Sequence, residues 1–159
     1  MAEERIGVLL EQMDQAFKGP AWHGPALLGT LRGVSAETAL RRPAEGRHNI
    51  WELVLHAAYW KQIVRRRITG DDSIEFPRSP ANWPTAPSRP SESQWKADKA
   101  LLKREHALLR AAVAKLSSAE LKRKGKGTRW RRETEIVGIA SHDLYHGGQI
   151  GLVKRLVGA

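Results

Sequence analysis

The sequence contains no cysteine, and this absence removes several classes of chemistry at once. Disulfide bonds, thiolate nucleophiles and cysteine-ligated metal sites are all excluded. A metal ion would have to be bound by His, Asp or Glu side chains. A reaction that needs a thiol would have to use a thiol carried by its substrate.

Long apolar runs are missing as well. No segment approaches the roughly 20 apolar residues that a membrane helix requires. The N-terminus, MAEERIGVLLEQMDQ, has acidic residues where a secretory signal would have basic ones. We therefore expect a soluble, cytoplasmic protein that makes no membrane contact. No segment alternates with a period of two, so strands are not expected.

What the sequence does have is a globular composition and an excess of positive charge. The chain has 159 residues, which suits one domain, 1–159. It is 41% hydrophobic, which is enough for a sizeable hydrophobic core. Its formal net charge of +10 favours an anionic partner without identifying one. The basic stretch 122–132 comes without a DNA-reading motif, so a nucleic-acid-associated protein is the least favoured function.

Helical periodicity accounts for most of the chain. Apolar residues recur at helical spacing in four long segments, at about 3–17, 49–68, 91–116 and 133–157. Asn49 with Glu52 has the pattern of a capping box, and Ser91 with Gln94 resembles it. Shorter helical pieces are expected at 26–32, 35–38 and 117–120. The prediction is an all-α four-helix bundle with short extra helical segments.

The segment 71–90 interrupts this pattern because it is rich in proline. It is expected to be a long loop with no helix of its own, and loops of this length inside a compact domain are often functional. Trp83 lies within it. The side chain is expected either to fold back as a lid or to cover the core.

Two histidines near the C-terminus, His142 and His146, have a spacing suited to metal binding. Four residues along a helix rise about 6 Å and return to nearly the same face, so both imidazoles can reach one ion. The alternative is a pair of histidines on one helix face that binds no metal. The metalloprotease motif H-E-x-x-H is rejected, since Asp143 is one methylene shorter than its glutamate base. The glycine and histidine of the extended motif are also absent.

A third ligand has to come from another helix. His56 lies on the inward stripe that contains Leu53 and Trp60. An isolated inward histidine is usually a hydrogen-bonded core residue. Facing an inward pair, however, it would complete a cluster of imidazoles that is costly to bury without a common partner. The sequence thus predicts one divalent metal ion per chain, bound by His56, His142 and His146.

Three motifs give the chain a resemblance to a known family: AWHGPALL at 21–28, HNIWELVLHAAYW at 48–60 and SHDLYHGGQI at 141–150. The chain resembles the DinB-like superfamily, also called the YfiT-like metal-dependent hydrolases, over nearly its whole length. The resemblance implies a four-helix bundle with one metal-binding histidine on the second helix and two on the last. These positions correspond here to His56, His142 and His146. The resemblance also implies nickel or zinc as the metal, and a homodimer.

The functions of such relatives leave the reaction open. Some are transferases or isomerases that use low-molecular-weight thiols such as bacillithiol, mycothiol or glutathione, and others have no known activity. The leading hypothesis is a metal-dependent enzyme, a hydrolase or a thiol S-transferase, that acts on a small molecule. The ion would activate a bound water or thiol. The alternative is a non-catalytic metal-binding or stress-response protein.

Several other residues are weaker candidates for a role at this site. Tyr145 is a candidate proton donor and Gln149 could reach a metal-bound water, although both could simply pack. His48 could line a substrate pocket, while surface or capping roles are favoured for it and for His23. His106 is expected in the core or at its rim.

Glu52 is the best candidate for a fourth metal ligand, although its capping box is the favoured role. Without it, three histidines leave at least one position on the ion for water or an exogenous ligand. The six tryptophans are expected mainly to anchor the core, with Trp51, Trp60 and Trp83 as candidate pocket walls. A dimer surface is expected from apolar residues off the main stripes, namely Ile6, Leu10, Leu101 and Leu108.

Overall fold

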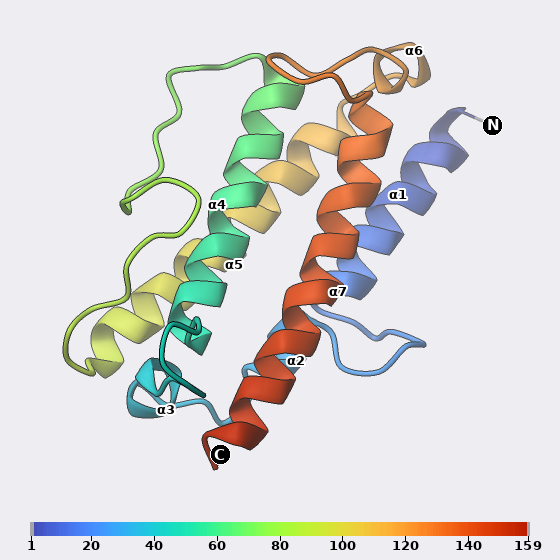
Figure 1. Cartoon of the computed structure of the whole chain (residues 1–159). Coiled ribbons are helices and arrows are strands. Elements are labelled where there is room, and N and C mark those ends of the chain that lie inside the picture. Colours follow the sequence, from blue (N-terminus) through green and yellow to red (C-terminus); the bar gives the residue numbers. More distant parts are fainter. Residues whose placement is uncertain (1, 159) are drawn as a thin grey trace.

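The computed structural model describes residues 2–158, with side chains from Glu4 onward, and it is all-helical (Figure 1). The four long helices are α1 (Ala2–Phe17), α4 (Ile50–Thr69), α5 (Glu92–Ala114) and α7 (Arg132–Leu156). Three short helices lie in the connections, namely α2 (Leu27–Thr30), α3 (Ala36–Leu40) and α6 (Ser118–Leu121). Within 2–158 there is no strand, only an isolated bridge from Lys124 to Arg131. The predicted all-α fold is confirmed.

The long helices form a bundle in which α4 and α7 run antiparallel at the front of Figure 1, with α5 behind α4 and α1 behind α7. Helix α4 contacts both α5 and α7, and α1 contacts both α7 and α5. His56 belongs to α4, whereas His142 and His146 belong to α7. The fold therefore brings the three predicted ligands to the contact between two neighbouring helices.

The helix ends follow the capping signals of the sequence. The Asn49 side chain accepts a hydrogen bond from the backbone N–H of Glu52, and the Glu52 carboxylate accepts one from the backbone of Asn49. This confirms the capping box that begins α4. Ser91 accepts from the backbone N–H of Gln94 at the start of α5. Gly70, with φ of 75°, ends α4 in the left-handed conformation that glycine adopts freely.

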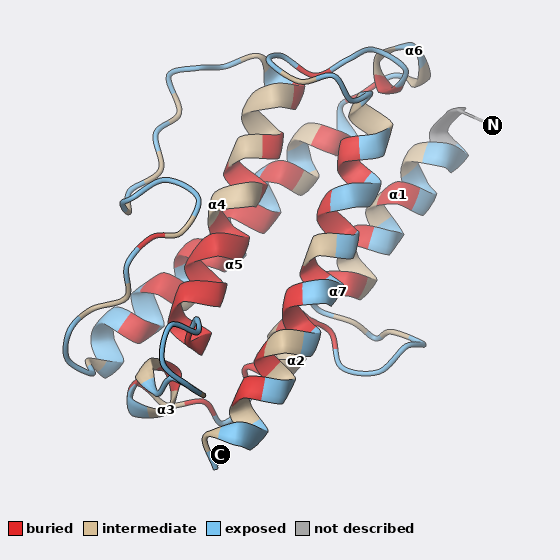
Figure 2. Ribbon diagram, viewed as in Figure 1, coloured by how far each residue is buried: buried red, intermediate tan, exposed pale blue. Residues whose placement is uncertain are grey.

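The N-terminal half of α4 is buried on all sides rather than along one stripe (Figure 2). Every residue from Ile50 to Ala58 is buried. Phe76 and Trp83 of the long loop between α4 and α5 pack against the core cluster to which this half of α4 belongs. The inward stripe predicted for this helix was therefore too narrow. Helical periodicity identifies the face that packs on neighbouring helices, but not a second face that a distant loop buries.

The tryptophans divide into core and surface residues. Trp51 and Trp95 are fully buried, and the Trp51 indole N–H donates to Asp98 at 2.9 Å. Trp51 therefore anchors the core, and it is not a pocket wall. Trp22 is 99% exposed and Trp130 is 48% exposed, so neither anchors the core. Both lie in connections outside the long helices, where helical spacing carries no information about burial.

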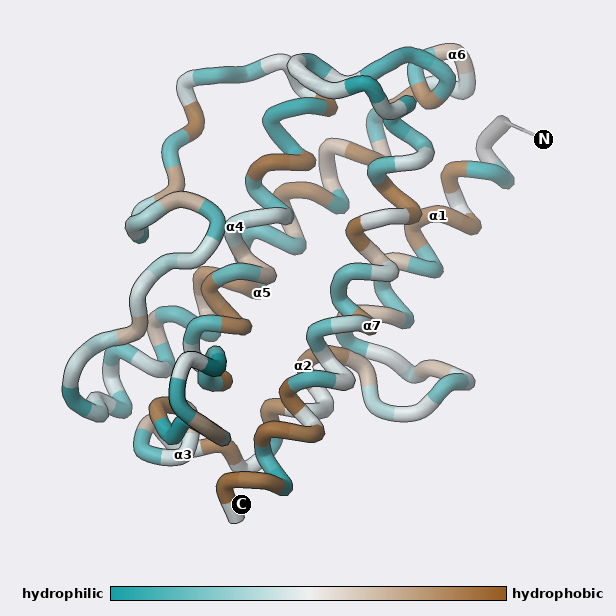
Figure 3. Tube along the Cα trace, viewed as in Figure 1, coloured by the Kyte–Doolittle hydropathy of each residue, from teal (hydrophilic) through white to brown (hydrophobic). Residues whose placement is uncertain are grey.

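The apolar surface differs from the expected one. Leu101 is buried, and Ile6 and Leu10 pack against the core, which leaves only Leu108 of that set exposed. The large aliphatic residues exposed on α7 are Val137, Leu144, Leu152 and Leu156. Hydrophobic and hydrophilic residues are interspersed along the long helices (Figure 3). Within the part of the chain described, no helix has the length and apolar character needed to cross a membrane.

Candidate metal centre

His56, His142 and His146 meet where α4 contacts α7. The Nε2 atom of His142 lies 3.2 Å from Nε2 of His56 and 3.0 Å from Nε2 of His146. The side chains of His56 and His146 are buried, and that of His142 is partly buried. One nitrogen from each ring lies within 4.8 Å of the others. The structure thus brings together the three histidines that the sequence singled out, in a cluster that could hold a metal ion.

The separations between these nitrogens suit a shared ion. Two imidazole nitrogens bound to one ion at about 2.0–2.1 Å, and about 90–109° apart, are separated by about 2.8–3.4 Å. The two Nε2–Nε2 distances of 3.2 and 3.0 Å fall within that interval. The donor set is also one that nickel and zinc both accept.

The outer nitrogens of two of the rings are already engaged. Nδ1 of His56 donates to the backbone carbonyl oxygen of Asn82 at 2.5 Å, and Nδ1 of His146 donates to Oε1 of Gln149 at 2.6 Å. A neutral imidazole carries one N–H, so both rings present a lone pair at Nε2. A single proton on Nε2 of His142 can satisfy only one of these lone pairs, whereas one cation can satisfy all three rings.

Burial keeps these imidazoles neutral. It lowers the pKa of His56 to about 4 and the pKa of His142 to about 3, from an ordinary value of 6.5. Burial also lowers the pKa of His146. The proximity of the rings adds repulsion between their charged forms, while the Asn82 carbonyl partly offsets the effect at His56. At neutral pH each ring is uncharged and keeps one nitrogen without a proton, which is the form that binds a metal.

The loop before α5 reaches this cluster through Asn82 and Trp83. Among the residues described, Asn82 is the only non-glycine with a positive φ, at 68°. Its Oδ1 accepts a hydrogen bond from Trp60 Nε1 at 2.8 Å, while its carbonyl holds His56. The Trp83 ring lies stacked between the rings of His48 and His56, 3.7 Å from each by centroid. Trp83 therefore covers the core and the histidine cluster together.

Glu52 does not complete the cluster as a fourth ligand. Its carboxylate forms an ion pair with Arg42 and contacts Nδ1 of His48 at 2.9 Å, besides capping α4. Within the described residues, no other cluster of His and acidic side chains has ligand spacing. An ion held by the three histidines would therefore keep open coordination positions.

A buried ion pair beside the cluster was not predicted. Lys61 of α4 and Asp143 of α7 approach to 2.5 Å, and each side chain is only 1% exposed. Burial lowers the pKa of Lys61 and raises the pKa of Asp143, and their mutual attraction opposes both shifts. Since Lys61 lies on α4 and Asp143 lies on α7, the pair joins the two helices that carry the histidines. Asp143 also directly follows His142 in the sequence. The one available signal was a lysine inside the apolar run of α4.

Tyr145 and Gln149 both lie beside His146, on the outer side of the cluster. Gln149 bonds the outer nitrogen of His146, so it orients that ring and does not face the shared Nε2 atoms. Tyr145 is 65% exposed, and its ring centroid lies 5.0 Å from that of His146. Both residues line a cavity next to His146.

The other three histidines lie outside the cluster. His48 contacts Glu52, which is itself part of the cap of α4, and it also lines the cavity beside His146. His23 is exposed and lines a different cavity. His106 is buried and stacks on Phe17 at 3.8 Å, which confirms its place in the core.

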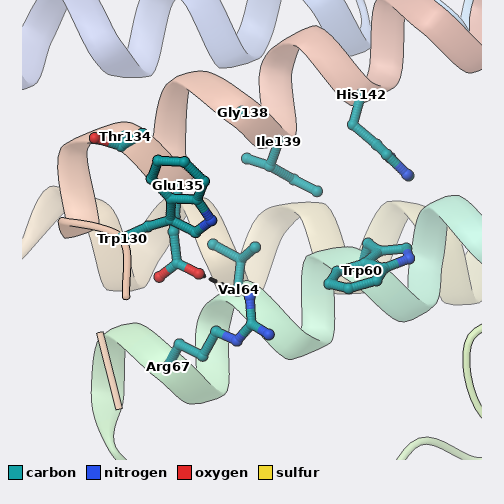
Figure 4. Close-up of a pocket in the computed structure, with 9 residues that line it drawn as sticks. All are labelled: Trp60, Val64, Arg67, Trp130, Thr134, Glu135, Gly138, Ile139 and His142. Carbon is teal, nitrogen blue, oxygen red and sulfur yellow. Dashed lines mark hydrogen bonds and ion pairs between the residues drawn. The ribbon is translucent and has the colours of Figure 1, made fainter. Parts of the chain in front are cut away.

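A cavity of about 330 Å³ adjoins His142 (Figure 4). Trp60 and Arg67 of α4 lie on one side of it, and Glu135 of α7 lies on the other. Nη1 of Arg67 donates to Oε1 of Glu135 at 2.8 Å, so both charges are paired. Trp130 contributes a half-exposed wall. Trp60 is thus a pocket wall, as expected.

A larger cavity of about 510 Å³ adjoins His146. Trp83 forms part of its wall, as expected, together with side chains from the connection before α4 and from the C-terminal half of α7. It shares no lining residue with the cavity at His142. The histidine cluster therefore lies between two separate cavities.

The fold and this site define an all-α bundle with a three-histidine cluster that could hold a metal ion. A model of the DinB superfamily matches residues 21–150, which include all three histidines. The chain therefore belongs to the DinB superfamily, and the predicted family assignment is confirmed. No curated protein and no solved structure gives a significant match.

Proposed function

We propose that the protein binds one divalent metal ion through His56, His142 and His146, and that it is an enzyme acting on a small molecule. The reaction would be hydrolysis or the transfer of a low-molecular-weight thiol. The proposal depends on the convergence of the three imidazoles, in which Nε2 of His142 lies at distances from Nε2 of His56 and of His146 that suit one ion. Nickel and zinc are the proposed metals because both bind imidazole well.

When bound, a divalent ion supplies Lewis acidity, which lowers the pKa of a coordinated water or thiol. The chain's own residues prepare the ligands. Asn82 and Gln149 hold protons on the outer nitrogens of His56 and His146, which leaves the inner nitrogens free to bind. Trp83 covers one face of the His56 ring and shields it from water.

Two features support a catalytic ion over a purely structural one. Structural zinc sites usually have four protein ligands, whereas the described residues supply three. A cavity adjoins the cluster on each side, at His142 and at His146, so a small molecule has room to approach. Both features suit a site that takes up a substrate.

Metal analysis after mild purification tests the binding step. We expect about one divalent ion per chain in the wild type. A triple variant, His56→Ala with His142→Ala and His146→Ala, should lose the ion. A His23→Ala variant should keep it, since His23 is exposed and lies outside the cluster. Full occupancy in the triple variant would overturn the assignment.

Activity assays test the catalytic step. Metal-loaded protein would be screened against hydrolysable esters and amides, and against electrophiles with several low-molecular-weight thiols. Turnover that needs both metal and thiol would identify a transferase, and turnover with water alone would identify a hydrolase. Absence of both from fully loaded protein would favour a non-catalytic metal-binding function.

A further inference from the structure

The cavity beside His146 has the size and lining of a site for an apolar molecule. Its volume of about 510 Å³ lies within the range of small-molecule sites, about 300–1,000 Å³. Leu53 contributes to the wall from α4, and Trp83 contributes from the long loop. The other apolar side chains of the wall are Pro43, Ala44, Leu152, Val153 and Leu156. An aliphatic chain or a ring would be removed from water there.

One charge at this cavity has no partner. Arg47 lines the cavity, and its backbone carbonyl accepts a hydrogen bond from Arg42. Over residues 4–158, however, its guanidinium makes no hydrogen bond and no ion pair. The neighbouring Arg42 differs, because it is paired with Glu52. No carboxylate lines the cavity, so an anion is the group that Arg47 would bind best.

Two further polar side chains on the wall can donate hydrogen bonds. The oxygen of Gln149 is used by His146, which leaves the amide N–H groups of Gln149 as donors. Tyr145 carries a hydroxyl and is largely exposed. The imidazoles of His48 and His146 also lie on the wall. A cation and neutral polar groups beside an apolar surface match a molecule with an apolar body and an anionic head.

We propose that this cavity binds an amphipathic anion, such as a medium-chain carboxylate. Its apolar body lies against Leu53, Trp83 and the C-terminal half of α7, and its anionic head lies at Arg47. The occupied cavity then places the molecule beside His146. The inference deepens the proposed function, and rests on it only for the reaction that follows binding.

Octanoate and its uncharged counterpart octanamide are suitable probes, because they differ in charge and little in shape. Binding would be measured by titration calorimetry and by backbone amide shifts, with the purified protein and with chelator-treated protein. We expect octanoate to bind more tightly than octanamide, with shifts at residues that line the cavity. Arg47 is exposed, so Arg47→Gln should weaken octanoate about two- to fivefold, the size expected for an exposed ion pair, and leave octanamide unchanged.

Arg89→Gln is the matched control, since it removes the same charge from an exposed position that does not line the cavity. It should leave both affinities unchanged. Equal octanoate affinity in wild type and Arg47→Gln would overturn the inference. Loss of octanoate binding on metal removal would also overturn it, because the ion would then be the anion's partner while the proposed metal function stood. Binding that survives metal removal and the triple histidine variant supports the inference even if the metal proposal fails.

Discussion

Nδ1 of His56 donates a 2.5 Å hydrogen bond to the backbone carbonyl of Asn82, a residue held at φ of 68°. The orientation of a candidate metal ligand thus depends on a loop conformation that β-branched residues rarely adopt. We expect Asn82→Val to weaken metal binding about tenfold, as loss of a hydrogen bond to a ligand typically does. Asn82→Gly keeps the backbone conformation and should bind metal almost as the wild type does.

Competition with a chelator of known affinity would give both dissociation constants. If the glycine variant bound metal as weakly as the valine variant, the important contact would instead be the hydrogen bond that Trp60 Nε1 donates to Asn82 Oδ1.

The buried Lys61–Asp143 pair should matter most when only one partner is removed. Lys61→Met leaves a buried carboxylate without its cation, and should lower the free energy of unfolding by about 3–5 kcal/mol. Replacing both, with Lys61→Met and Asp143→Leu, should recover most of that loss. Arg41→Met, which breaks the exposed pair with Glu37, should cost at most about 1 kcal/mol. Urea denaturation of the wild type and of the three variants measures these free energies. A double variant as unstable as the single would contradict the expectation.

His106 should make stability depend on pH. Burial and the nearby Lys61 cation lower the pKa of His106 to about 3, from 6.5. Between these values the unfolded chain binds a proton that the folded chain does not. Above about pH 6.5 His106 does not lower the free energy of unfolding. Below that pH the free energy of unfolding falls as the pH falls, by up to about 1.4 kcal/mol per pH unit from this residue.

His106→Phe should make that fall shallower between about pH 4 and pH 6 by the same amount per unit. His23→Phe should not, since His23 is exposed. Denaturation of chelator-treated protein at several pH values would measure both slopes. Parallel curves for wild type and His106→Phe would show that the ring takes up its proton without cost.

A homodimer remains a prediction, and the exposed surface suggests where the subunits would meet. Trp22 is 99% exposed. The next residue, His23, lines a groove together with Leu144 and Gly148 of α7. We expect light scattering at micromolar concentration to give twice the mass of the chain. Trp22→Ser should shift the protein toward the monomer, and Trp130→Ser should not. A wild-type monomer would contradict the prediction.

Much of the fold and site could be predicted because the controlling interactions are local. Helical spacing located the four long helices, and the Asn49–Glu52 capping box marked where α4 begins. The spacing of His142 and His146 on one helix face depends only on the helical repeat. Placing His56 with them required an inward stripe on another helix and the resemblance to the DinB-like superfamily. The structure confirms that these three residues meet.

Other features arise from contacts between residues far apart in the chain, which no local pattern encodes. The stacking of Trp83 on His56 depends on the path of a long loop, and the Lys61–Asp143 pair depends on the register between α4 and α7. The position of Arg47 at a cavity without a carboxylate depends on how the connection before α4 meets the end of α7. The sequence by itself determined the helices and the candidate ligands through short-range geometry. Only the tertiary structure decided what covers the ligands, what joins their helices and which charge is left for a ligand, because side chains from distant segments must pack together before those contacts exist.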